Sequence, residues 1–153
     1  MPTTNGTEVA VIGTGRVGAQ WLFTIDALLG EVVDVGMTPA GRRRVIPVVG
    51  GTVHGSIEGV VLPGGADWNL EHPDGSVELW ARYELRLADG AVVSVLNTAL
   101  HEPEPSVPIL TSPRFDVGDD GPVALRTGAY VGLLEPRLDE GNVRIEVHRL
   151  TAV

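Results

Sequence analysis

Hydrophobic and polar residues alternate along much of this chain. The alternation is most regular from Val77 to Leu87, where every second residue starting with Val77 is apolar and most of the residues between are charged. A period of two residues is typical of a β-strand with one buried face. The turn sequence HPDG precedes this segment, ADG follows it, and the next run is again extended. Residues 77–99 are therefore predicted to form a β-hairpin.

The other apolar segments are short and are separated by frequent turns. The chain contains 20 glycines and 11 prolines, which divide it into many small segments. The four prolines between residues 102 and 113 predict a loop. Residues 22–29 are predicted to form a strand, although LFTIDALLG would also suit a short helix. The pattern indicates an all-β domain, with further strands predicted at 32–35, 44–49, 56–62, 66–70, 123–134 and 143–150.

Length and charge limit the organisation of the chain and its partners. A chain of 153 residues fits one compact domain. Its 20 acidic and 11 basic residues give a formal net charge of −9, which disfavours nucleic acids and anionic membranes as partners. The absence of cysteine excludes disulfides, thiolate metal sites and a cysteine nucleophile. Because the sequence lacks an apolar leader and a membrane-length apolar run, we expect a soluble, cytoplasmic protein.

A glycine motif near the N-terminus has the spacing of a nucleotide site. Gly13, Gly15 and Gly18 follow the apolar run EVAVI as G-x-G-x-x-G, and Asp34 lies close to the place of the ribose-binding acid. Such a site also needs a long amphipathic helix and a parallel strand after the glycines. Here strand-like segments follow, so we expect a glycine-rich hairpin or a loose N-terminal arm, and no cofactor.

Several short motifs occur in a fixed order from residue 22 onward. They are GRRRVIP (41–47), GGTVHG (50–55), LPGGADW (62–68), ARY (81–83), the pairs Asp74-Gly75 and Asp89-Gly90, and SPRFDVG and AYVGLLEP near the C-terminus. This set resembles the DUF3237 family, also known as UPF0311, over residues 22–150. The chain departs from the family pattern in residues 100–113, where a polar, proline-rich segment replaces a longer loop.

The resemblance implies a single antiparallel β-barrel of lipocalin-like appearance. The barrel would comprise residues 22–153, preceded at residues 1–21 by an N-terminal arm or an extra hairpin. A barrel of about eight strands can enclose one small ligand in a mostly apolar pocket. Some relatives are associated with secondary metabolism, where they look like cofactor-independent ring-forming enzymes. The function then depends on which polar residues face the barrel interior.

Asp67 is the first candidate for a catalytic group. Together with Trp68 it follows a Pro-Gly-Gly turn, so its carboxylate would lie at the barrel rim near a substrate proton. Partial burial beside Trp68 would raise the pKa of the carboxyl, which suits general acid–base chemistry. In the alternative interpretation, Asp67 only accepts backbone N–H groups in the turn.

Arg82 and Trp80 lie on the polar face of the 77–87 strand, opposite Leu79 and Tyr83. If the apolar face fills the barrel, Arg82 points outward and forms cross-strand ion pairs. If the interior is polar, Arg82 binds a carboxylate or enolate oxygen through its guanidinium. The sequence leaves both orientations open, and the cost of burying an unpaired Arg favours the outward one.

The remaining candidates are histidines and hydrogen-bonding residues expected near the barrel mouth. The imidazole groups of His54 and His101 could transfer a proton, or these side chains are simply exposed in polar loops. The four histidines show no metal-binding spacing, so we expect no metal site. The candidate ligand contacts are Trp68, Trp80, Tyr83, Asn97, His101 and Tyr130.

These candidates lead to the hypothesis of a cofactor-free barrel enzyme, a cyclase or isomerase. It would promote ring closure in a small apolar, oxygenated, polyketide-like metabolite. Asp67 or His54 would accept a hydroxyl proton, and Arg82 or Tyr83 would stabilise negative charge on a carbonyl oxygen. The alternative is a non-catalytic binding or carrier barrel in which the same residues only orient the ligand. A homodimer is a further expectation, based on the frequency of twofold assemblies.

Overall fold

The computed structural model describes residues 8–12 and 15–152. Within these ranges the chain forms β-strands and short 3₁₀ helices, and none of its helices there is long and apolar enough to cross a membrane. The strands are β1 (Glu8–Ile12), β2 (Gly15–Leu29), β3 (Val33–Thr38), β4 (Gly41–Gly55), β5 (Gly59–Val61), β6 (Gly65–Glu71), β7 (Val77–Leu87), β8 (Val92–His101), β9 (Ile109–Val117), β10 (Ala129–Arg137) and β11 (Asn142–Ala152), and the helices are η1 (Val123–Arg126) and η2 (Leu138–Glu140).

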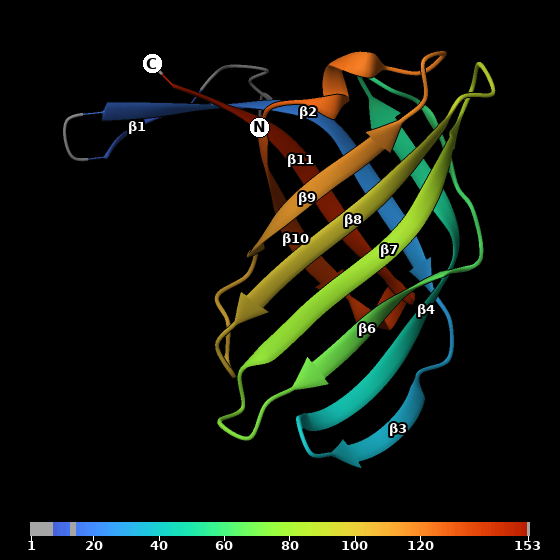
Figure 1. The fold of residues 1–153 in the computed structure, drawn as a ribbon, viewed down its shortest axis with the longest axis vertical. Coiled ribbons are helices and arrows are strands. Elements are labelled where there is room, and N and C mark those ends of the chain that lie inside the picture. The colour runs from blue at the N-terminus through green and yellow to red at the C-terminus, as the bar shows by residue number, and fades with distance from the viewer. Residues whose placement is uncertain (1–7, 13–14, 153) are drawn as a thin grey trace.

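The strands close into one antiparallel barrel (Figure 1). Around the barrel the order is β2, β11, β10, β9, β8, β7, β6 and β4, and β4 pairs again with β2, which gives eight strands. The short β5 also lies between β4 and β7, farther along the same gap. β3 pairs with β4 and lies at the lower end of the barrel in Figure 1. The predicted all-β, lipocalin-like barrel is thus confirmed.

Strand alternation places one face of each strand inside the barrel. In β7, Tyr83, Leu85 and Leu87 are buried, whereas Arg82 and Arg86 are exposed. The apolar face of β7 therefore points inward, which is the outward orientation considered for Arg82. The half of the barrel near the end of β7 is filled by a core that includes Phe23, Leu85, Val93, Val95, Phe115, Val117, Leu125 and Val147.

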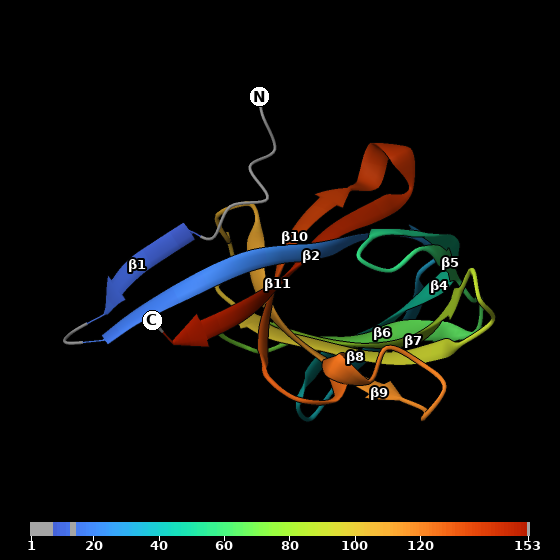
Figure 2. The same cartoon turned by 90° about the horizontal axis from the view of Figure 1, so that it is seen from above.

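β1 and the first part of β2 form an antiparallel ribbon that projects from the barrel (Figures 1 and 2). Gly15 and Gly18 lie in β2, and Gly13 lies outside the described residues. β2 has 15 residues, begins at Gly15 and continues past Gly18 to Leu29, instead of forming the helix of a dinucleotide-binding unit or the short helix considered for 22–29. β2 passes residues 21 and 22 without a break, and its last part pairs with β4 in the barrel wall.

β4 is longer than the sequence predicted. We expected strands at 44–49 and 56–62 with a break at the glycines between them, but β4 continues to Gly55 and β5 has only 3 residues. Gly51 has a φ of 130° and Gly55 a φ of 133°, and a Cβ at either residue would overlap the backbone of β2. These glycines let β2 approach β4 closely, which closes the barrel.

Two predictions for the last third of the chain were wrong. The loop expected at 102–113 is shorter, because β9 begins at Ile109 and contains Pro113. A proline fits here because β9 pairs with β10 only over residues 109–111, so Pro113 needs no N–H on that side. The strand expected at 123–134 is split into η1 and β10, which are separated by Gly128 with a φ of 106°.

Candidate functional site

The barrel encloses a cavity of about 240 Å³ in the half that the core does not fill. Alternate strands of the antiparallel barrel run in the same direction, so β2, β6, β8 and β10 all end at the same end of the barrel. The cavity lies at that end. The polar side chains that line it are Asp67, Asn69, Tyr83, Asn97 and His101. The rest of the wall is mostly apolar and includes Leu29, Ile46, Leu79, Leu134, Val143 and Ile145. An apolar cavity with a few polar groups is typical of a site for a small organic molecule.

Two of the polar residues lie in one row across the sheet. Asp67 on β6 is directly opposite Ala81 on β7, and Ala81 is directly opposite Asn97 on β8. Since neighbouring strands are about 4.8 Å apart, the Cα atoms of Asp67 and Asn97 are separated by roughly 10 Å. The side chain of Ala81 is small, so space remains between the carboxyl group and the amide for part of a ligand.

Asp67 is held in place by hydrogen bonds to both carboxylate oxygens. Its Oδ1 accepts the backbone N–H of Trp80 at 2.9 Å, and the Asn69 amide donates to Oδ2 at 3.5 Å. Burial raises the pKa of the Asp67 carboxyl above its ordinary value of 3.8, and these two hydrogen bonds oppose the rise. Asp67 therefore accepts a backbone N–H, as in the structural interpretation. However, Asp67 belongs to strand β6 and not to a turn, and its side chain also lines the cavity.

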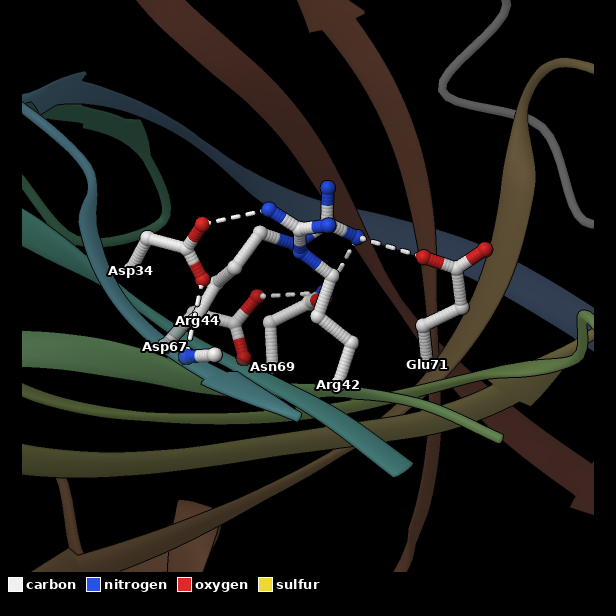
Figure 3. A network of polar contacts seen from close by, with 7 residues as sticks. Asp34, Arg42, Arg44, Asp67, Asn69 and Glu71 are labelled. Atoms are coloured by element: carbon white, nitrogen blue, oxygen red, sulfur yellow. Dashed lines mark hydrogen bonds and ion pairs between the residues drawn. The ribbon is translucent and has the colours of Figure 1, made fainter. Parts of the chain in front are cut away.

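A chain of polar contacts continues from Asp67 along β4 and β6 (Figure 3). Arg44 donates to Asn69 Oδ1 at 3.2 Å, and the same Arg44 nitrogen lies 3.6 Å from Glu71 Oε2. Arg44 is the cross-strand neighbour of Asn69, so the register of β4 with β6 creates this contact. The positive charge of Arg44 lowers the pKa of Asp67 and so limits the effect of burial.

Tyr83 and Asn97 each bring a buried polar atom to the cavity. Tyr83 is 2% exposed, and its hydroxyl has no hydrogen-bond partner among the described residues. Asn97 is 3% exposed, and its Oδ1 also lacks a partner in the part of the chain that the structure describes. Burial strongly raises the pKa of the Tyr83 hydroxyl above 10.0, which keeps it a neutral donor. A ligand oxygen between these groups would satisfy hydrogen-bonding atoms that are costly to leave unpaired.

His101 lies at the end of β8 and lines the cavity near its mouth. Its Nδ1 is 2.7 Å from the carbonyl oxygen of Glu102, so Nδ1 carries a proton and donates it to that oxygen. Leu138 in η2 lies beside the same opening and is 75% exposed. The mouth therefore combines one polar ring with an exposed apolar side chain.

Three of the predicted site residues lie on the outer face of the barrel, away from the cavity. His54 is exposed on β4, and its ring centroid is 6.5 Å from that of Trp21. Trp68 and Trp80 form an edge-to-face pair with ring centroids 5.6 Å apart. Because residues 67 and 81 face inward, strand alternation turns both tryptophans outward.

The other two predicted residues, Arg82 and Tyr130, meet at a second depression outside the cavity. Arg82 points outward and lies 3.7 Å from Asp116. Tyr130 packs edge to face against Phe115, with ring centroids 5.2 Å apart, and its hydroxyl donates to the carbonyl oxygen of Thr127 at 2.8 Å. The structure thus brings Asp67, Tyr83, Asn97 and His101 together and separates them from this pair.

Sequence reasoning did not identify Asn69 or Arg44 as parts of the site. Asn69 follows Asp67 by two positions in a strand, so alternation alone places both on the same face. Arg44 reaches the site only through the pairing of β4 with β6, which no local pattern specifies. Across residues 15–152, no group of three His, Asp or Glu side chains is placed to hold a metal ion.

These features define a small closed barrel with room for one ligand, in which a few polar groups interrupt an apolar wall. The family model for DUF3237, described as a protein of unknown function, matches residues 18–150. The chain therefore belongs to the DUF3237 family.

Similar proteins cover nearly the whole chain. A UPF0311 protein of Bradyrhizobium diazoefficiens is 36% identical over 152 residues, which cover 90% of this chain and 99% of the relative. The crystal structure of a conserved protein of unknown function from Rhodopseudomonas palustris has a TM-score of 0.79 at 35% identity, covering 88% of this chain and 98% of that one. The crystal structure of an enzyme from Penicillium herquei has a TM-score of 0.69 at 20% identity, covering 90% and 98%, and shares the fold.

Proposed function

We propose that this protein is a cofactor-independent barrel enzyme, a cyclase or isomerase that closes a ring within a small, largely apolar, oxygenated metabolite. One observation supports this proposal above the others. A carboxyl group with a raised pKa, a neutral buried phenol and an unpaired amide oxygen line one mostly apolar cavity. The fold shared with an enzyme from Penicillium herquei is a second support.

Asp67 acts as the general base in this proposal. In its ionised form it accepts the proton of a substrate hydroxyl group, which makes the hydroxyl oxygen nucleophilic. Oδ1 is fixed by the N–H of Trp80, whereas Oδ2 has only the longer contact with Asn69, so Oδ2 is the freer acceptor. A raised pKa makes the carboxylate a stronger base than an exposed aspartate.

Tyr83 and Asn97 act on the charge that develops during ring closure. When the substrate oxygen attacks the β-carbon of an enone, a C–O bond forms and the alkene electron pair moves to the carbonyl oxygen. The Tyr83 hydroxyl donates a hydrogen bond to the resulting enolate oxygen. Asp67 then returns its proton to the α-carbon, so the product is an isomer of the substrate. Asn97 orients the substrate by accepting a hydrogen bond at Oδ1.

The apolar wall supplies the second part of the rate enhancement. Leu134, Val143 and Ile145 on β10 and β11 lie across the barrel from the polar residues on β6 to β8. A flexible substrate pressed against this wall is held in a folded conformer with its reacting atoms close together. Such positioning contributes up to about 7–11 kcal/mol in the most favourable intramolecular reactions.

A non-catalytic binding or carrier barrel is the second candidate. The bond from Trp80 N–H to Asp67 favours it, because this contact gives the carboxylate a structural role in joining β6 to β7. In such a protein, Tyr83 and Asn97 would only orient the ligand, which would be released unchanged.

The experiment that separates the two candidates is incubation with a panel of linear hydroxy-enones, followed by liquid chromatography and mass spectrometry. The proposal expects a product with a new retention time and the mass of its substrate. Asp67→Asn and Tyr83→Phe should reduce its rate of formation, and the outward-facing His54→Gln should leave the rate unchanged. Saturable binding with only unchanged ligand recovered would favour the carrier. Full turnover by both cavity variants would contradict the assigned roles.

A further inference from the structure

A second depression, of about 400 Å³, lies on the outside of the barrel between β9 and η1; we call it the outer groove. β9 and β10 pair only over residues 109–111 on β9, and beyond Thr111 their hydrogen bonding stops. Pro113, which has no N–H to donate across the gap, lies in the part of β9 that does not pair with β10. The segment around η1 fills part of the gap, and the outer groove is the space that remains.

The outer groove is rich in guanidinium groups although the protein is acidic. Arg82, Arg114 and Arg126 all line it, which places three of the 11 basic residues of the chain around one depression. Arg82 and Arg114 belong to the same cross-strand row, with the apolar Leu96 between them. Two positive charges with an apolar residue between them lack the alternating signs of an ordinary cross-strand ion-pair row.

The three guanidinium groups are only partly neutralised by nearby acids. Arg82 has a distant contact of 3.7 Å with Asp116, whose side chain is 84% exposed. Arg126 is occupied by Asp119 at 2.6 Å and by the Val117 carbonyl oxygen at 2.8 Å. Arg114 forms no side-chain hydrogen bond or ion pair with any residue in the described ranges. Arg82 and Arg114 are therefore available to an external anion.

The Tyr130 ring forms part of the wall of the same groove, whereas the Phe115 side chain is 7% exposed and belongs to the core. Phe115 and Tyr130 pack edge to face, and Arg149 lies 5.5 Å from the centroid of the Tyr130 ring. The Tyr130 hydroxyl is fixed by its bond to Thr127 and by Arg149 Nη1 at 3.0 Å. A fixed aromatic wall beside guanidinium groups matches a ligand that has a flat apolar body and one acidic group.

We propose that the outer groove binds an organic anion with a flat apolar body, such as an aryl carboxylate. The carboxylate lies between Arg82 and Arg114, where it replaces the weak contact with Asp116, and the apolar body rests against Leu96 and Tyr130. The site is separate from the cavity and is independent of the function proposed above. It also gives a common role to Arg82 and Tyr130, which the sequence marked as a catalytic candidate and a ligand contact respectively.

The test measures binding of 2-naphthoate by calorimetry and by amide chemical-shift changes in the ¹⁵N-labelled full chain. The neutral analogue 2-naphthamide serves as the ligand control. We expect 2-naphthoate to bind more tightly than the amide, with amide shifts centred on residues 114–117 and 126–130. Arg114→Gln should weaken this binding by about three- to fivefold, as expected for one exposed charge. Arg86→Gln, which removes an exposed arginine from the same strand as Arg82, should have no effect.

Three results would overturn the proposal. They are equal affinity for the acid and the amide, unchanged affinity in Arg114→Gln, or shifts confined to residues of the internal cavity. Asp67→Asn should bind 2-naphthoate as the wild type does, so failure of the enzyme hypothesis would leave this test intact. Because Arg114 is exposed and has no side-chain partner in the described structure, its replacement should not impair folding.

Discussion

Tyr83→Phe removes one buried oxygen atom and leaves the aromatic ring in the core. The Tyr83 side chain is 2% exposed, and its hydroxyl finds no partner among the described residues. Burying such a group costs about 1–3 kcal/mol in proteins, whereas phenylalanine carries no such cost. We therefore expect Tyr83→Phe to raise the free energy of unfolding by about 1 kcal/mol, equivalent to about 2–4 °C in the melting temperature for a chain of this size.

Tyr130→Phe is the matched control for this change. The Tyr130 hydroxyl donates to Thr127 and accepts from Arg149, so its removal should lower the free energy of unfolding by about 0.5–1.5 kcal/mol. The assay is urea unfolding of both variants with the slope m compared to the wild type, so that changes in midpoint report changes in stability. Destabilisation by Tyr83→Phe of the same size as by Tyr130→Phe would contradict this prediction, because it would show that the Tyr83 hydroxyl is satisfied in the ligand-free protein.

Three further predictions concern Asp67 and the barrel wall. The pKa of the Asp67 carboxyl is higher in the folded protein than its ordinary value of 3.8, so Asp67 should lower the free energy of unfolding as the pH rises from 3.8 to the folded-state pKa. Over the same pH range, Asp67→Asn should gain stability relative to the wild type in urea unfolding. A constant difference between the two proteins would refute this. Arg44→Gln should raise the pKa of Asp67 further, because it removes a nearby positive charge, and carboxyl ¹³C NMR titration would show an unchanged pKa if the network in Figure 3 were absent. Gly132→Ala should cost about 1–3 kcal/mol because its Cβ would overlap Thr111 Oγ1, and Thr111→Ala in the same chain should recover much of that loss in thermal unfolding.

The sequence predicted the strands whose pattern is local. The period of two in β7 gave both ends of that strand and the division between its buried and exposed faces. The same reasoning predicted less of β4, because Gly50, Gly51 and Gly55 resemble a break. The actual role of Gly51 and Gly55 is close contact with the backbone of β2, which pairs with β4 only in the folded barrel.

The candidate site was predicted in part for a similar reason. Tyr83 belongs to the apolar face of β7, which alternation places opposite Arg82, but the pattern alone did not decide which of the two faces lines the interior. Arg44 was missed because its contact with Asn69 depends on the register between β4 and β6. Arg82 was left open between two directions, and the burial of its neighbours on β7 decides that it points outward.

The most direct test of the central claim is to locate a bound ligand by NMR with isoleucine methyl labels. Ile46, Ile109 and Ile145 line the cavity, whereas Ile25 and Ile57 pack in or against the core and do not line it. With a turned-over or tightly bound hydroxy-enone, we predict intermolecular NOEs to the methyl groups of the first three residues and none to Ile57. NOEs from that ligand only to residues on the outer surface would contradict the claim that the internal cavity is the functional site.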